Sequence, residues 1–465
     1  MLKTIGFWIV LVIYFFFSSP VTAYDPLEQP NNKVGIGIIN HSDLVDASLL
    51  VNKNGDWGYV TIVITEDQRD KNTWQKFFNE CRELHLIPIL RVASKFDGNN
   101  WQVPEIENID SWVNFFNSLN WVIKNRYIII GNEPNHAKEW GGKINPQEYA
   151  KYLKTFSERL KNSSSDYFVL PAGFDQSAGN TNNTMEQVKY MESMVKSDPD
   201  VFQFIDGLNS HSYPNPAFSG LKTDIGRKSI RGYEWEIDLF KSLGVSRDLP
   251  VFITETGWSS KNLSQDTIAE NMKYAFMDVW NKDKNVVAVT PFILNYQQQP
   301  FNDFSWKKND LEFNLVYSKI QQISKNMGYP IQEIEGEILL KFLNPISATA
   351  SRKTGYLIIK NNGQNIWNEL NVNLISDNKN IKVDNIRIKD DIYPFNTGLV
   401  AYSIAFPENP NIYEVNIGFY VNQKSLGSAY SGKIISFPLP QKKNNKFFDT
   451  INMFYLSIKN VLKGP

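Results

Sequence analysis

Short apolar runs alternate with amphipathic stretches over residues 34–294, and this pattern predicts strands that alternate with helices. Eight such runs end near residues 40, 65, 93, 133, 174, 211, 255 and 294. From the fourth run onward the ends are 41, 37, 44 and 39 residues apart, a length that holds one strand, one helix and their loops. Continuous apolar strands separated by helices are typical of parallel strands buried on both faces.

The simplest closed arrangement of eight such units is a (β/α)8 TIM barrel. A doubly wound open sheet is the alternative, but no Gly-x-Gly-x-x-Gly motif follows the first strand. Helical spacing of apolar residues is clear in 146–162 and 267–281, and we expect 312–328 to form the last helix. The barrel domain is therefore predicted to span residues 24–335.

The pattern changes after the predicted barrel. Apolar and polar residues alternate with a period of two between 345 and 440, with Asn-Gly and Pro-rich turns, which predicts a small antiparallel, sandwich-like β domain. Residues 446–465 then place Ile451, Phe454 and Ile458 on one helical face. We expect this amphipathic tail to pack on the barrel, with a membrane surface as the alternative partner.

The N-terminus has the pattern of an export signal. Lys3 precedes an apolar run over residues 7–17, and residues 21–23 supply small residues at a cleavage site. The run is shorter than the ~20 residues that span a bilayer. We expect cleavage after Ala23 and a secreted or extracytoplasmic protein, with an uncleaved anchor at the cell surface as the alternative.

Composition narrows the classes of function. The 465 residues contain 48 Lys plus Arg and 49 Asp plus Glu, a balance that argues against a nucleic-acid-binding surface. The one cysteine, Cys81, excludes an intramolecular disulfide and is expected to pack on the apolar side of a helix. No spacing of His and Cys suggests a metal site and no glycine-rich loop suggests a nucleotide site, so we expect no cofactor.

Two glutamates directly follow predicted strands. Glu133 comes after the fourth strand and Glu255 after the seventh, 122 residues later. Chemistry in a (β/α)8 barrel gathers where strands end, and strands four and seven lie across the mouth from one another. A converging pair of carboxylates suits cleavage of a glycosidic bond, with one as proton donor and the other as nucleophile. A structural ion pair is the alternative reading.

The segments GNEPN (131–135) and ITETGWSS (253–260) resemble the acid/base and nucleophile motifs of the retaining clan A glycoside hydrolases. The resemblance covers residues 30–328 and extends equally to families 39 and 5 of that clan. It implies that Glu133 is the general acid/base and Glu255 the nucleophile. It also implies that Asn132 contacts the sugar 2-hydroxyl.

Further candidates for substrate binding lie at other strand ends. His211 and Tyr213 follow the sixth strand, where the clan has a histidine or tyrosine that orients the nucleophile or the sugar. Arg91 in the third strand is expected to hold Glu255 ionised, with a structural ion pair as the alternative. Trp258 suits either a sugar platform or a lid on the core. After strand eight, Tyr296 stands where many clan members have a tryptophan.

These observations predict an exported retaining β-glycosidase that acts on a poly- or oligosaccharide. A transglycosylase that remodels wall or capsule polymer would use the same two glutamates and differ in the acceptor. A catalytically inactive glycan-binding surface protein is the second alternative, and the intact carboxylate pair argues against it.

Overall fold

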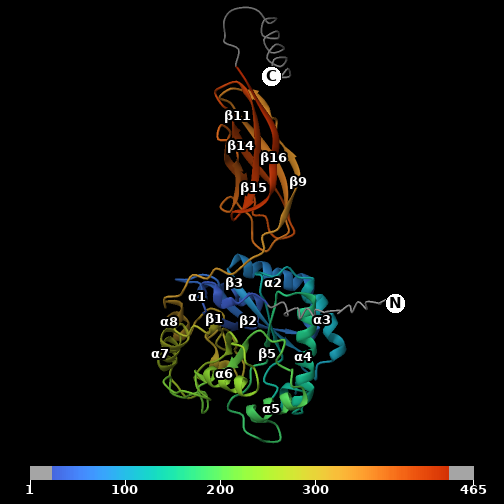
Figure 1. Cartoon of the computed structure of the whole chain (residues 1–465). Helices are drawn as coiled ribbons and strands as arrows, with labels where there is room; N and C mark the ends of the chain where they lie inside the picture. Colours follow the sequence, from blue (N-terminus) through green and yellow to red (C-terminus); the bar gives the residue numbers. More distant parts are fainter. Residues whose placement is uncertain (1–22, 439–465) are drawn as a thin grey trace, which may run out of the picture.

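The computed structural model describes residues 23–438, which form two domains with separate hydrophobic cores (Figure 1). Most of the predicted signal segment 1–23 and all of the predicted tail 446–465 lie outside the described residues. Within the described residues, no helix is long and apolar enough to cross a membrane.

The larger domain is a (β/α)8 barrel, as predicted. Its strands are β1 (Gly35–Ile38), β2 (Gly58–Thr65), β3 (Leu86–Ala93), β4 (Arg126–Ile130), β5 (Tyr167–Pro171), β6 (Leu208–His211), β7 (Val251–Glu255) and β8 (Val286–Val289). Strands β1 to β5 pair in parallel in chain order, and so do β6 to β8.

Two further contacts close the barrel. Val34, just before β1, forms a parallel bridge with Val289 of β8. The Asn209 side chain on β6 donates a hydrogen bond of 3.1 Å to the carbonyl of Pro171 on β5. These contacts exclude the open sheet that the sequence left as an alternative.

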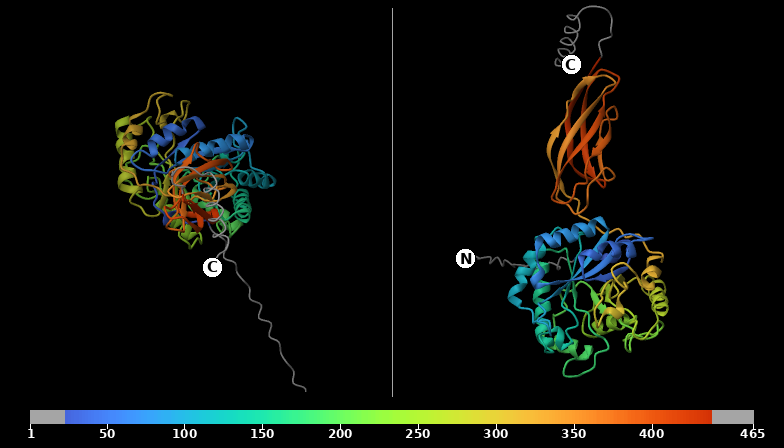
Figure 2. Two further views of the ribbon diagram at one scale, coloured as in Figure 1. Left: turned by 90° about the horizontal axis from the view of Figure 1, so that it is seen from above. Right: turned by 180° about the vertical axis from the view of Figure 1, so that it is seen from behind.

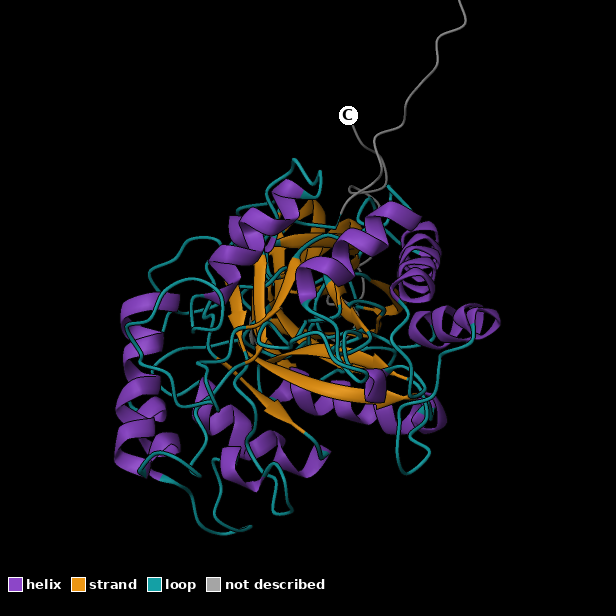
Figure 3. Ribbon diagram, turned by 90° about the horizontal axis from the view of Figure 1, so that it is seen from below, coloured by secondary structure: helices purple, strands orange, loops and turns teal. Residues whose placement is uncertain are grey.

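Helices surround the strands on the outside of the barrel (Figure 3). They are α1 (Leu44–Val51), α2 (Lys71–Glu83), α3 (Ile109–Asn117), α4 (Pro146–Ser163), α5 (Gln187–Ser197), α6 (Gly232–Ser242), α7 (Gln265–Tyr274) and α8 (Leu315–Gln321). The strands are apolar because both faces are covered, and Ile128, Ile129 and Ile130 of β4 are fully buried. Cys81 is a free, buried cysteine on α2.

Helix α8 is shorter than the predicted segment 312–328. The Lys325 ammonium folds back and donates hydrogen bonds of 2.9 Å to the carbonyls of Ile320 and Gln321. The Lys325 amide in turn bonds to the carbonyl of Asn54, in the loop before β2. The helix ends here because the Lys325 ammonium caps its last carbonyls and the Lys325 amide bonds outside the helix.

The smaller domain is a sandwich of two four-stranded sheets, with strand orders β10-β16-β15-β12 and β13-β14-β11-β9. Its strands are β9 (Gly336–Phe342), β10 (Ile346–Ala348), β11 (Arg352–Asn361), β12 (Val372–Ser376), β13 (Lys382–Ile388), β14 (Thr397–Ala405), β15 (Asn411–Val421) and β16 (Lys424–Phe437).

Strand β9 lies ahead of residue 345, where the sequence pattern places the start of this domain. β9 pairs antiparallel with β11, yet Leu339, Leu340 and Phe342 are all exposed. An edge strand held mainly by its backbone does not need alternating apolar and polar residues, so its sequence has no period-two signal.

The β domain contacts the barrel at the end where the strands begin. Arg82 at the end of α2 is buried and donates to the Gln364 carbonyl at 2.5 Å. Asn120, in the segment before β4, donates to the Gly363 carbonyl at 3.0 Å. The Gln364 side chain donates to the Ile123 carbonyl at 2.9 Å. The β domain therefore extends from the end of the barrel opposite the carboxyl ends of the strands (Figure 2).

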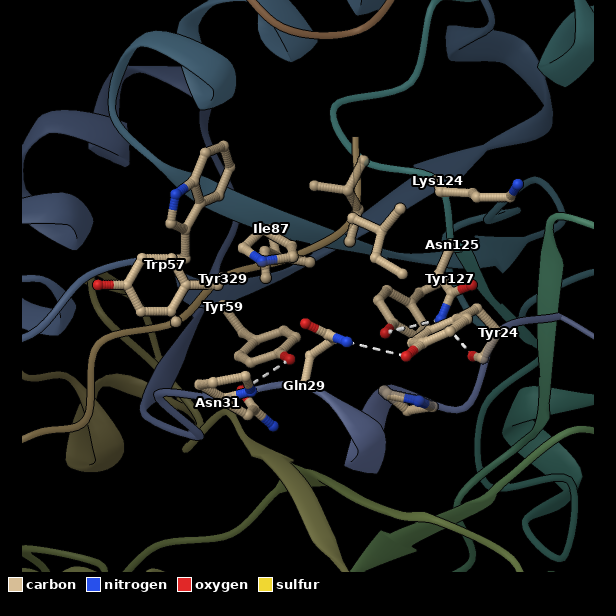
Figure 4. A pocket seen from close by; sticks show the side chains of 16 residues that line it. Tyr24, Gln29, Asn31, Trp57, Tyr59, Ile87, Lys124, Asn125, Tyr127 and Tyr329 are labelled. Carbon is tan, nitrogen blue, oxygen red and sulfur yellow. Dashed lines mark hydrogen bonds between the residues drawn. The ribbon is translucent and has the colours of Figure 1, made fainter. Parts of the chain in front are cut away.

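A pocket also lies at this end of the barrel, lined by aromatic residues that include Tyr24, Tyr59 and Tyr127 (Figure 4). Its polar groups largely satisfy one another: Gln29 donates to the Tyr24 hydroxyl at 2.9 Å, and the Tyr59 hydroxyl donates to Asn31 at 2.9 Å. It is remote from the strand ends that carry Glu133 and Glu255, and we assign it no part in the chemistry.

Candidate active site

The backbone around Glu133 turns the chain into the barrel mouth directly after β4. Gly131 has φ of +86°, a conformation that glycine adopts at little cost. Glu133 has φ of +29°, which is uncommon for a residue with a side chain. Its amide donates to the carbonyl of Gly173 at 3.0 Å, and the amide of His136 donates back to the Glu133 carbonyl at 2.9 Å. These bonds hold the turn that presents the carboxylate.

Glu255 is the last residue of β7 and its side chain is only 14% exposed. Arg91 on β3 donates to its Oε1 at 2.5 Å, and the Tyr213 hydroxyl donates to its Oε2 at 3.1 Å. Both carboxylate oxygens therefore have a donor. Such a geometry fixes the carboxylate in the ionised form that a nucleophile requires.

His211 lies between the two carboxylates. Its Nδ1 is 2.8 Å from Oε1 of Glu133 and 3.7 Å from Oε2 of Glu255. A carboxylate oxygen of Glu133, a ring nitrogen of His211 and a carboxylate oxygen of Glu255 all lie within 4.8 Å of one another. The structure thus brings together two carboxylates from strands on opposite sides of the mouth.

The charges of this cluster determine how it titrates. Burial alone would raise the pKa of Glu255, but the charges of His211 and Arg91 together with hydrogen bonds from Tyr213 and Arg91 lower it below its ordinary value. Burial would lower the pKa of His211, yet the carboxylates of Glu255 and Glu133 raise it. Burial and the charge of Glu255 raise the pKa of Tyr213, so this hydroxyl keeps its proton and donates it.

Asn132 joins this network through Arg91. The Arg91 Nη1 that bonds Glu255 also donates to Oδ1 of Asn132 at 2.6 Å. The Asn132 side chain also forms a hydrogen bond with Glu139. Arg91, which the sequence left between two readings, is therefore a partner of Glu255 and not part of an ion pair elsewhere.

The two aromatic candidates Trp258 and Tyr296 lie in different surroundings. Trp258 is only 2% exposed and its indole nitrogen donates to the Gly220 carbonyl at 2.8 Å, so it packs as a lid on the core and cannot stack on a sugar. Tyr296 is half-buried and packs edge-to-face against Phe301, with ring centroids 5.5 Å apart. Among the described residues, Tyr296 makes no hydrogen bond or ion pair with either carboxylate, and its contact with substrate stays a prediction.

The aromatic wall beside Glu255 and Tyr213 consists of residues that the sequence did not single out. The Tyr213 ring packs against Phe218 at 5.0 Å and against Phe304 at 6.0 Å, and Phe304 in turn contacts Phe292 at 6.0 Å. Phe292 follows β8 and precedes a cis peptide bond. These rings come from the two connections that follow β6 and β8, and only the folded barrel places them together.

A third carboxylate, Glu139, was also missed by the sequence reasoning. It ends a short 3-10 turn, Ala137–Glu139, in the segment after Glu133. Burial and the charge of Glu133 raise its pKa to about 7, against the lowering effects of Arg91 and of a hydrogen bond with Asn132. Glu139 lies within a connecting segment and not directly after a strand, so the sequence pattern did not mark it.

Glu133, His211 and Glu255 are also the group of side chains best placed to hold a metal ion among the described residues. Glu255, however, already bonds the guanidinium of Arg91, and this fixed positive charge opposes a second cation at the same carboxylate. The donor set therefore fits a charge-paired carboxylate site better than a metal centre.

Comparison with known proteins gives similar structures but no related sequence. No family model matches the chain, and no curated protein matches it. A family 39 glycoside hydrolase from Bacteroides cellulosilyticus aligns over 82% of this chain and 82% of its own, with 11% identity and a TM-score of 0.45.

Two further structures align over the barrel. A monomeric β-xylosidase from Caulobacter crescentus covers 63% of this chain and 68% of its own, with 13% identity and a TM-score of 0.45. A subfamily 18 member of glycoside hydrolase family 5 from Streptomyces cattleya, solved with GlcNAc, covers 63% of this chain and 80% of its own, with 11% identity and a TM-score of 0.46.

Proposed function

We propose that the protein is a retaining β-glycosidase that acts on a poly- or oligosaccharide. The observation that carries the proposal is the approach of the two carboxylates, whose oxygens come within 4.8 Å across the mouth of the barrel. Retaining enzymes place the two carboxyl groups ~5–5.5 Å apart, whereas inverting enzymes leave ~6.5–9.5 Å for a water molecule. The short separation supports direct attack by one carboxylate.

Glu255 is the nucleophile in this proposal. Its carboxylate is ionised by Arg91 and oriented by Tyr213, and its attack on the anomeric carbon forms a glycosyl-enzyme ester while the glycosidic bond breaks. As the ester forms, Glu255 loses its negative charge. The Arg91 guanidinium then remains beside Asn132, where both can support the hydroxyl at carbon 2 of the sugar.

Glu133 is the general acid and then the general base. It shares a hydrogen bond with His211, so a proton is available at this pair when the leaving oxygen departs. In the second half of the reaction, Glu133 accepts a proton from water, which attacks the ester and releases Glu255. Transfer to a sugar hydroxyl instead of water would give the transglycosylase, with the same residues in the same roles.

We further propose that the protein acts outside the cytoplasm. This part of the proposal rests on the N-terminal pattern of Lys3, the apolar run 7–17 and the small residues 21–23. Alternatively, the N-terminal segment or the amphipathic tail 446–465 retains the protein at the cell surface. Fractionation of cells would distinguish surface retention from secretion.

The test is a hydrolysis screen of residues 24–465 against a panel of polysaccharides, with Glu255→Gln as the inactive control. We expect wild-type protein to release reducing ends from at least one polymer and the variant to release none. Folded wild-type protein that cleaves no polymer and transfers no sugar would count against the proposal and favour a glycan-binding role.

A further inference from the structure

Glu139 is a half-buried carboxylate in the wall of the proposed active site. It lines a pocket together with Arg91, Asn132, Trp101 and Trp140. Among the described residues, no Lys, Arg or His lies within ion-pair distance of Glu139, although most partly buried carboxylates of the barrel have such a partner. A carboxylate withdrawn from water without a cation is costly to ionise, and the pKa of Glu139 is raised to about 7, so a bound cation would stabilise its ionised form.

Arg91, the one cation among the residues that line this pocket, is paired with Glu255 and not with Glu139. Arg91 uses the same nitrogen, Nη1, for Glu255 and for Asn132. The mouth therefore holds three carboxylates, Glu133, Glu139 and Glu255, against one guanidinium and the imidazole of His211. With all five groups charged, this cluster has an excess of one negative charge, which a bound cation would neutralise. The nearby ion pair of His136 with Asp175 adds no net charge.

The wall that carries Glu139 is built before any ligand arrives. The amide of Trp101, in the loop after β3, donates to the Lys138 carbonyl at 2.8 Å, and the amide of Gly141 donates to the Trp101 carbonyl at 2.7 Å. The Trp140 indole nitrogen donates to Glu148 at 2.8 Å. The two bonds of Trp101 and Gly141 fix the loops to one another, and Glu139 lies in the wall that they form.

We propose that Glu139 binds an ammonium group of the substrate, so that the enzyme acts on a glycan with free amino groups, such as a de-N-acetylated amino-sugar polymer. The inference rests on the proposed glycosidase function and names its substrate class. Asn132 links the two sites, since it adjoins Glu133 in sequence and interacts with Glu139, so the ammonium group belongs to a sugar at or next to the bond that is cleaved.

The experiment compares glucosamine oligosaccharides with cello-oligosaccharides of equal length as substrates for wild type, Glu139→Gln and Glu107→Gln. Glu107 is an exposed residue on the neighbouring loop and controls for the lost charge. We expect wild type to prefer the amino sugar, and Glu139→Gln to reduce the ratio of the two kcat/KM values about tenfold or more, as loss of a charge-assisted hydrogen bond does. Glu107→Gln should leave the ratio unchanged.

Binding measured by calorimetry with Glu255→Gln protein separates this inference from the proposed function. Tighter binding of the glucosamine oligomer than of the cello-oligomer, lost in Glu139→Gln/Glu255→Gln, supports the ammonium site even if wild type hydrolyses neither. Equal binding of both oligomers, or a preference for glucosamine that survives Glu139→Gln, overturns it even if wild type hydrolyses other glycans.

Discussion

His211 bonds Glu133 through Nδ1 at 2.8 Å, although it ends strand β6, which pairs with the strand of Glu255 and not with that of Glu133. Its ring has no exposed side-chain surface, so the charge of the imidazolium acts on both carboxylates without screening by water. Tyr213, two residues later, takes the contact with Glu255. His211 and Tyr213, at the end of β6, thus each bond one of the two carboxylates.

The first prediction separates the roles of the two glutamates. Glu133→Ala should slow cleavage of natural glycosides by about 10²- to 10⁴-fold, because general acid catalysis of the leaving group is lost. Aryl glycosides with acidic phenols need little protonation and should be cleaved at a much smaller penalty in the first step. Steady-state and burst kinetics on both substrate types measure this, and equal loss on both would contradict the assignment.

The second prediction concerns Arg91. Arg91→Ala should lower kcat/KM by roughly 10²-fold or more, because the variant loses a charge-assisted bond to Glu255 that also positions Asn132. The acid limb of the pH–rate profile should move to higher pH, since the guanidinium is one cause of the lowered pKa of Glu255. Arg91→Lys should recover part of both effects. An unchanged acid limb in Arg91→Ala would show that Arg91 is only structural.

His211 should make stability depend on pH in a defined direction. Its pKa in the folded protein is raised above the ordinary value of 6.5, so its contribution to stability is complete below that value and is lost as pH rises through the higher folded pKa. Thermal unfolding of wild type and His211→Asn between pH 5.5 and 9 should show a difference that shrinks toward alkaline pH. A difference that grows with pH would contradict the charge assigned to His211.

Glu236 provides the opposite case. This fully buried residue on α6 receives a hydrogen bond from Gln187 at 2.6 Å, and burial raises its pKa to about 7 from 4.5. Folding therefore favours the protonated form, and stability falls as pH rises from 4.5 to 7. Glu236→Gln should be more stable than wild type at pH 8, by up to about 3 kcal/mol, and should lose this advantage at pH 4.5.

Urea unfolding at both pH values checks the Glu236 prediction. Glu192→Gln, an exposed change on α5, is the matched control and should leave the pH dependence as it is. An advantage of Glu236→Gln that is equal at both pH values would mean that the carboxyl does not titrate in this range.

Arg82 should matter for the junction of the domains and not for the chemistry. Its buried guanidinium bonds the Gln364 carbonyl of the β domain and the Asn120 side chain of the barrel. Arg82→Ala should destabilise the protein by roughly 2–3 kcal/mol because it leaves these acceptors unpaired. Protease cleavage between residues 328 and 336 should become faster. Arg387→Ala, an exposed change in the β domain, is the control, and equal protection in both variants would contradict the role of Arg82.

The barrel was predictable because its strands are buried on both faces. Apolar runs such as Ile128–Ile130 predict a strand by composition alone. Glu133 and Glu255 could then be identified as site candidates because they lie at the ends of such strands. β9 was not predictable as part of the sandwich, because an exposed edge strand carries no alternation. Glu139 and Phe304 were missed because they lie in loops. The local sequence pattern does not predict the conformation of a loop, so it could not place these side chains in the mouth.

The stereochemistry of the first sugar released is the most direct test of whether Glu255 is the nucleophile of a double displacement. Once the screen identifies a substrate, proton NMR during the first minutes of hydrolysis reports the anomer before it equilibrates. The proposed double displacement predicts that a β-glycoside yields the β-anomer first, because attack by Glu255 and then by water inverts the anomeric carbon twice. The α-anomer as first product would mean a single displacement by water, and it would contradict the assignment of Glu255 as nucleophile.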